Sequence, residues 1–179
     1  MSSNSVIYTP TRWAKRVLTT NSTDTSSFSI PADTATAPTD QSGGYVDMGE
    51  CAPGGTTNTV MVHFLVQHGS AAEAKTASVQ CYGVEYDRNA TATAYSHIPL
   101  WEVDLVGGSL ATGETDEAYC DTITESSNLC GAIVRNAVGA TDFANSIANI
   151  VMDQLGFQWL YFQFDVGDAV AVNAIVRGF

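Results

Sequence analysis

Apolar and polar residues alternate along several stretches of the chain, and this period of two predicts β-strands. The clearest stretch is 59–68, TVMVHFLVQH, whose one face carries Val60, Val62, Phe64 and Val66. The opposite face holds Met61 and Leu65 together with His63 and Gln67, so apolar residues occur on both faces. This pattern indicates a central strand that is covered on both sides or lies at an interface.

Further strands are expected at 78–88 and 97–108. In the second of these, Trp101, Val103 and Leu105 point inward, while Glu102 and Asp104 alternate with them and face solvent. In the first, the apolar phase shifts beside Gly83, and the shift predicts a β-bulge. Shorter strands are expected at 45–48 and within 129–139.

The C-terminal residues predict a β-hairpin. Residues 160–166 alternate between two sets of side chains, with Leu160, Phe162, Phe164 and Val166 on one face. In residues 170–176, Val170, Val172, Ala174 and Val176 recur at every second position. Gly167-Asp168 between them matches the Gly-X signature of a type II′ turn. The two stretches are therefore expected to pair with each other in the core.

One stretch shows helical spacing instead, and it predicts an amphipathic helix over about 142–155. Thr141 or Asp142 would cap its start, and Gly156 would end it. The apolar residues that recur at helical intervals are Phe143, Ile147, Ile150, Val151 and Leu155. The acidic stretch at 109–128, by contrast, is expected to be a turn-rich surface excursion.

Residues 1–42 differ in character from the rest of the chain. They combine a short basic segment with a connector rich in Thr, Ser, Ala, Asp and Pro, which predicts an extended arm followed by a sparsely packed linker. The body is expected to span 43–179. The fold class predicted is all-β: a β-sandwich of jelly-roll type with one amphipathic helix and an extended N-terminal arm.

Charge is distributed unevenly between these parts. The chain has a formal net charge of −12, yet residues 1–23 contain three cations and no acid. The rest carries four cations against 19 acids, and a body this acidic repels a phosphate backbone. Nucleic acid is therefore disfavoured as a partner. No apolar run has the length of a signal sequence or a membrane span, so synthesis in a cytoplasm and no membrane partner are expected.

The four cysteines lack the spacing of a zinc site or a redox pair. Free, half-buried thiols are the favoured interpretation, and a single bridge between Cys120 and Cys130 is the alternative. Whether Cys51 or Cys81 pairs is left open.

No catalytic, cofactor-binding or metal-binding motif is found, and we expect no enzymatic activity and no cofactor. His63 and His68 are five residues apart on a strand and point to opposite faces, so they cannot share one ion. Casual calcium binding by the acidic run 114–121 is left open. An alternative of another class is a carbohydrate-binding or carbohydrate-cleaving jelly roll that uses Trp101 or Trp159 with Glu102 and Asp104.

In overall character the chain resembles structural proteins of tailed-phage virions, especially capsid decoration (cement) proteins. The features that carry this resemblance are the arm MSSNSVIYTPTRWAKRVL, the Thr/Ser/Ala-rich connector to Ser42, and a Gly-punctuated β-rich body that ends on VNAIVRGF. The resemblance implies a bacteriophage virion protein that stabilises the capsid by bridging neighbouring subunits. It also implies the major capsid protein or other virion subunits as partners and a homo-oligomer, with a trimer favoured. A tail or head–tail component is the alternative placement.

The arm itself carries residue types that anchor interfaces, because Trp and Arg are enriched among the residues that dominate binding energy. We therefore expect the arm to dock on a partner protein rather than to remain free. The docking residues predicted are Tyr8, Arg12, Trp13, Lys15, Arg16, Val17 and Leu18.

Overall fold

The computed structural model describes ten ranges of the chain: 16–18, 28–38, 44–48, 59–67, 74–87, 94–107, 117–136, 148–153, 155–169 and 171–178. Every regular element in these ranges is a β-strand, and every pairing is antiparallel. The strands are β1 Arg16–Leu18, β2 Tyr45–Asp47, β3 Thr59–Gln67, β4 Thr76–Asp87, β5 Ala94–Gly107, β6 Glu117–Asn128, β7 Ile133–Arg135, β8 Asn149–Asp153, β9 Trp159–Asp165 and β10 Ala171–Gly178.

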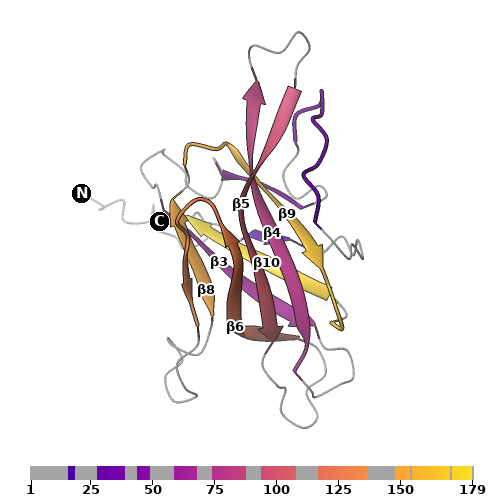
Figure 1. Ribbon diagram of the computed structural model, residues 1–179, viewed down its shortest axis with the longest axis vertical. Coiled ribbons are helices and arrows are strands. Elements are labelled where there is room, and N and C mark those ends of the chain that lie inside the picture. Colours follow the sequence, from indigo (N-terminus) through magenta and orange to yellow (C-terminus); the bar gives the residue numbers. More distant parts are fainter. Residues whose placement is uncertain are drawn as a thin grey trace, which may run out of the picture.

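The strands form two sheets that pack face to face (Figure 1). In sheet A, β3 is central: β10 and then β1 follow on one side, and β8 and then β7 follow on the other. Sheet B has the order β2–β9–β4–β5–β6. The start of β6 pairs with β3 and the remainder pairs with β5, so this strand joins the two sheets. The predicted all-β sandwich is confirmed, and its jelly-roll connectivity stays a prediction.

The core between the sheets is built around Trp101, whose side chain is buried. Its ring contacts Phe64 of sheet A edge-on at a centroid distance of 6.3 Å and Phe162 of sheet B at 5.9 Å. The indole N–H points at the sulfur of Met152 on β8, 3.1 Å away. The tryptophan thus links three strands from both sheets, and its polar N–H has a partner despite complete burial.

The strands predicted from period-two alternation are present at β3, β4 and β5. Leu65, on the second apolar face of β3, is buried, which agrees with a central strand covered on both sides. The predicted bulge is confirmed as a register shift between Cys81 and Tyr82. The additional residue is Leu100 on β5, because Cys81 pairs with Trp101 and Tyr82 pairs with Pro99.

The predicted helix over 142–155 is wrong where the structure describes it. Residues 149–153 form β8, which pairs with β3 and β7. Ile150 and Met152 are buried and Asp153 is exposed, which is the alternation of a strand. Leu155 and Gly156 then form a turn, both with positive φ (57° and 79°). The adjacent Ile and Val suit an extended strand better than a helix, and the sheet neighbours stabilise it. Residues 141–147 lie outside the described ranges.

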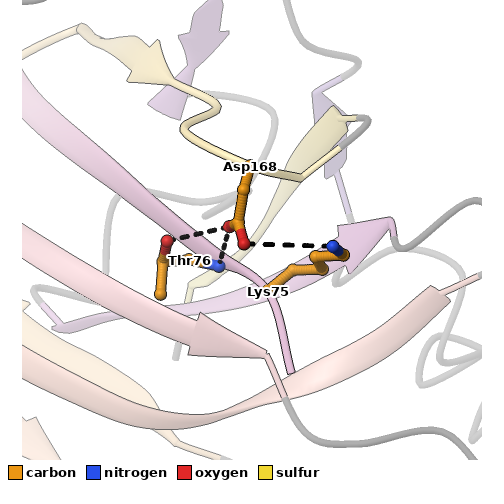
Figure 2. A network of polar contacts seen from close by, with 3 residues as sticks. All are labelled: Lys75, Thr76 and Asp168. Atoms are coloured by element: carbon orange, nitrogen blue, oxygen red, sulfur yellow. Dashed lines mark hydrogen bonds and ion pairs between the residues drawn. The ribbon is translucent and has the colours of Figure 1, made fainter. Parts of the chain in front are cut away.

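The predicted C-terminal hairpin is also wrong. β9 pairs with β4 and β2 in sheet B, whereas β10 pairs with β3 and β1 in sheet A. Gly167-Asp168 therefore connects the two sheets across the core instead of joining neighbouring strands. The turn is closed by the N–H of Ala169, which donates to the carbonyl of Val166 at 2.8 Å. The Asp168 carboxylate holds this connection on the start of β4 through Thr76 and Lys75 (Figure 2).

The acidic stretch at 109–128, predicted as a surface excursion, contains the strand β6. Cys120 and Ile123 are buried in the core, while Asp121, Thr124 and Glu125 are exposed. Only two apolar side chains in the described part of β6 face inward, so the alternation that would predict a strand is weak here. Residues 108–116 lie outside the described part of the chain.

Two pieces of the predicted arm and connector lie against the sandwich. β1 pairs with β10 at the edge of sheet A, where Val17 lies opposite Ile175. Residues 28–38 run beside the long β4–β5 hairpin, which projects beyond the rest of the sandwich (Figure 1). They are fixed there by Thr34, which exchanges two backbone hydrogen bonds with Tyr95. These residues are mostly exposed, in agreement with a sparsely packed segment.

Candidate functional site: the base of the projecting hairpin

An aromatic cluster lies on the outer face of sheet B, where the β4–β5 hairpin leaves the sandwich. Tyr45, Tyr161 and Tyr82 are direct neighbours across β2, β9 and β4, and their rings form one row. The ring centroids are 4.5 Å apart for Tyr45 and Tyr161 and 5.8 Å apart for Tyr82 and Tyr161. His97 of β5 joins the row, 5.2 Å from the ring of Tyr161. Strand register alone therefore brings four titratable rings together.

His97 is buried in this cluster, with 5% of its surface exposed. Its Nε2 shares a hydrogen bond of 2.7 Å with the hydroxyl of Tyr45, while its Nδ1 has no hydrogen-bond partner among the described residues. Burial lowers the pKa of His97, and the nearby carboxylate of Asp33 only partly opposes this effect. The imidazole is consequently neutral at neutral pH, and it acts as a packed ring rather than as a charge.

The hydroxyl of Tyr82 is the polar centre of the same face. It lies 2.6 Å from Oε1 of Gln80, 3.0 Å from Oε1 of Gln163 and 3.1 Å from the carbonyl oxygen of Ser29. Because one hydroxyl has one proton, these three acceptors share it. Burial is the main cause that raises the pKa of Tyr82 to about 12. The contact with Ser29 attaches the segment 28–38 to the sheet.

Glu102 and Asp104, the acids considered for sugar cleavage, lie on the outer face of sheet B as predicted. Both oxygens of Asp104 accept hydroxyl hydrogen bonds, from Ser78 at 2.6 Å and from Ser126 at 2.9 Å. The carboxylate thus ties β4 and β6 to β5 across the sheet. Asp104 has a structural role here that needs no substrate.

The two tryptophans considered for sugar stacking are both buried. Trp101 is 2% exposed and belongs to the core, so it is not available to a ligand. Trp159 is 9% exposed and packs edge-on against Tyr95 at 5.7 Å. Neither indole offers the open flat surface that the carbohydrate alternative requires.

Cys81, Cys120 and Cys130 are free thiols, and the bridge considered between Cys120 and Cys130 is absent. Burial raises the pKa of Cys120 to about 12, and it also raises the pKa values of Cys81 and Cys130. These thiols stay protonated at neutral pH, whereas a nucleophilic cysteine requires the thiolate. Cys51 lies outside the described residues.

His63, the second described histidine, lies on β3 at the face of sheet A that points away from the core. Its Nδ1 is buried without a hydrogen-bond partner among the described residues. Burial lowers the pKa of His63, and the charge of Arg177 acts in the same direction. His68 lies outside the described ranges, so the predicted opposition of the two imidazoles stays a prediction.

The predicted docking residues fall at the N-terminal limit of the described chain. Arg16, Val17 and Leu18 form β1, whose backbone is paired with β10. The remaining four residues, Tyr8, Arg12, Trp13 and Lys15, lie outside the described residues. Of the predicted docking residues, the structure therefore places only Arg16, Val17 and Leu18, at the edge of sheet A.

A groove that sequence reasoning missed lies at the base of the hairpin. Its volume is about 260 Å³, and it is lined by Val84, Glu85, Tyr86, Leu155, Gly156, Phe157, Gln158 and Trp159. Three of these residues come from β4, and the other five come from the segment between β8 and the start of β9. The helix predicted for that segment hid the groove, because it treated Leu155 as part of a packed helical face.

The described residues contain no group of three side chains suited to hold a metal ion. In the same part of the chain, no helix is long and apolar enough to cross a bilayer. Comparison with protein-family models, with curated proteins and with solved structures returns no match for this chain.

Proposed function

We propose that this protein is a non-enzymatic structural protein of a bacteriophage virion, a capsid decoration protein that bridges neighbouring subunits. The observation that carries the proposal is the pairing of β1 with β10. Three backbone positions of the basic arm are held on the edge of a rigid sandwich, so residues 1–15 start from a fixed point on its rim. Such an arm is suited to reach a neighbouring protein and to bind it by ordering on contact.

The charges support docking on a protein. The arm is basic and contains no acid before Asp24, whereas the body is strongly acidic. Complementary charge of this kind steers encounter and favours one orientation over others. Trp13 between Arg12 and Lys15 supplies an apolar anchor that charge alone does not provide. Virion subunits, including other copies of this acidic body, are the partners that fit.

The titratable groups of the described residues support a non-enzymatic role. An active site needs pKa values that bring a base or a nucleophile into its reactive form near neutral pH. Here burial raises the pKa values of Cys81, Cys120 and Cys130, so these thiols stay protonated and are not held as the thiolates that a nucleophilic role requires.

Co-sedimentation with capsid particles of the encoding virus tests the proposal. Deletion of residues 1–15 leaves β1 and all other described strands in the chain. We expect the truncated protein to keep the far-UV circular dichroism of the full chain and to lose particle binding. A full-length variant with Ser2, Ser3 and Asn4 changed to Ala is the matched control and should bind normally. Undiminished binding by the truncated protein would overturn the proposal. If electron microscopy finds the labelled protein on tails and not on capsids, the protein is a tail component instead of a capsid decoration protein.

A further inference from the structure

The groove at the base of the hairpin is open to solvent and is lined by both apolar and polar groups. Its large side chains include Leu155 and Tyr86, with 50% and 42% of their surfaces exposed, and the less exposed Trp159 and Phe157. Glu85 is the one charged residue among the described residues that line it. Large exposed apolar side chains gathered around a concavity mark a binding site for another apolar group. The carboxylate indicates that the bound group is flanked by a cation.

The walls of the groove are held in place by packing. The ring of Phe157 lies directly on Gly83, where a side-chain carbon would come within about 2.5 Å of it. The absence of a side chain on Gly83 is therefore what lets β4 and this ring approach. Trp159 is fixed edge-on against Tyr95. A preformed site of this kind avoids the entropic cost of ordering its walls when a ligand binds.

The arm emerges at the same end of the sandwich as the groove. Arg16 pairs with Val176, close to the end of β10. Because β10 pairs with β3 and β3 pairs with β8, the same end of sheet A also contains Asp153, the last residue of β8. The groove residues begin two positions after Asp153. Figure 1 shows the end of β10 beside the end of β8, and the link from β8 to β9 then runs to the base of the hairpin.

The arm of the same chain is poorly placed to bring Trp13 to this groove. Two strands separate β1 from β8, so these strands are about 14 Å apart across the sheet. Trp13 precedes Arg16 by three residues, and an extended chain of that length covers about 10 Å. The arm of the same chain would have to run fully extended across the end of the sheet, whereas an arm from a second copy approaches the groove without this constraint.

We infer that the groove binds the N-terminal arm of a second copy of this protein, with Trp13 inserted between Tyr86 and Leu155. The inference rests on the proposed function, because it specifies how arms connect subunits. With Trp13 in the groove, Arg12 or Lys15 lies close enough to pair with Glu85, so both the apolar and the charged features of the groove are used. Each copy gives one arm and receives another, so the contact links copies of this protein into an oligomer.

Analytical ultracentrifugation of two full-length variants tests this inference. Leu155→Asp disables the groove, and Asp tolerates the positive φ of this position. The triple variant Arg12→Ser, Trp13→Ser, Lys15→Ser disables the arm. We expect the unmodified protein to form an oligomer, and each variant to self-associate at least about tenfold more weakly. An equimolar mixture of the two variants should form a one-to-one complex, because one retains the arm and the other retains the groove.

Leu129→Asp is the matched control, since Leu129 is 71% exposed and lies outside the groove. It should associate like the unmodified protein. A monomeric unmodified protein, or a mixture of variants that does not associate, would overturn the inference. Particle binding separates this failure from failure of the proposed function. If Leu155→Asp binds particles normally and the arm deletion does not, the groove has no role in particle binding and the proposed role of the arm stands. Glycans that bind the groove instead would favour a carbohydrate module.

Discussion

Thr76 donates both its backbone N–H and its hydroxyl to the same carboxylate oxygen of Asp168, at 2.6 Å and 2.8 Å, although the two residues are 92 positions apart (Figure 2). The second oxygen of Asp168 lies 3.9 Å from the Lys75 ammonium. The turn containing Asp168 crosses from sheet B to sheet A. These contacts hold it on Thr76, the first residue of β4. They lower the pKa of Asp168, mainly through the hydrogen bond from the Thr76 backbone.

Replacement of Asp168 by Ala should destabilise the protein by roughly 0.5 kcal/mol, since it removes two hydrogen bonds to the carboxylate at an exposed position where water can replace the acceptor. Asp168→Asn should cost less, because the amide oxygen still accepts. The lowered pKa means that the stabilisation is present above the usual value of 3.8 and is lost as the pH falls through the value in the folded state. Urea unfolding at pH 7 measures the difference, with Asp121→Ala on the exposed face of β6 as the control. Equal urea midpoints for all three variants would contradict a stabilising role of the contacts between Asp168 and Thr76.

Gly167→Ala should be more costly than Asp168→Ala. The backbone φ of Gly167 is +54°, and a side-chain carbon there would lie 2.6 Å from the carbonyl oxygen of Thr76. Strain at positive φ costs about 1–3 kcal/mol, and the clash with a backbone atom adds to it. Gly131→Ala separates the two effects, since Gly131 also has a positive φ (72°) but open space around it. Thermal unfolding should show a larger loss for Gly167→Ala, and equal losses would exclude the clash.

The turn at Gly167 also shows what the sequence could predict and what it could not. Gly-Asp correctly indicated a tight reversal with positive φ, because this requirement is local. Whether the flanking strands then pair with each other or enter different sheets depends on partners such as β3 and β4, which lie far away in the sequence. Distant partners also decided the conformation of β8. Its segment has some helical spacing, but pairing with β3 and β7 makes it a strand.

The candidate site was less predictable than the strands. Inward-facing Trp101, Val103 and Leu105 followed from alternation, since burial on one face leaves a direct pattern. Tyr82 is instead on the outer face and is buried because Ser29 and the neighbouring rings cover it. The groove likewise joins β4 to a segment about seventy residues further on. No local pattern encodes these contacts between distant segments.

Removal of the Tyr82 hydroxyl should weaken the attachment of the segment 28–38 to sheet B. Tyr82→Phe keeps the ring but removes the proton shared by Gln80, Gln163 and the carbonyl of Ser29, at a cost of about 1 kcal/mol. We expect faster limited proteolysis within 28–38 and a lower urea midpoint. Tyr86→Phe is the matched control, because Tyr86 is 42% exposed. Unchanged proteolysis in Tyr82→Phe would mean that the Thr34–Tyr95 backbone pair alone holds the segment.

Acidification should destabilise the aromatic cluster through His97. Because burial lowers its pKa below the usual 6.5, the unfolded chain binds a proton more readily than the folded protein does. The stabilisation is therefore complete above about pH 6.5, which is the ordinary value of the unfolded state, and it is lost as the pH falls from there toward the folded-state pKa.

The effect can be isolated by measuring urea unfolding at pH 7.5 and pH 5.5. His97→Gln stays neutral at both pH values, so the variant should lose less stability on acidification than the unmodified protein. His63 has a pKa lowered in the same direction by burial and by Arg177, so His63→Gln should remove a separate share of the pH dependence. The two sites lie on different sheets, and their effects should add in the double variant. If His97→Gln retains the full pH dependence, the pKa of His97 is the same in the folded and unfolded states, which would contradict the lowered pKa of the buried ring.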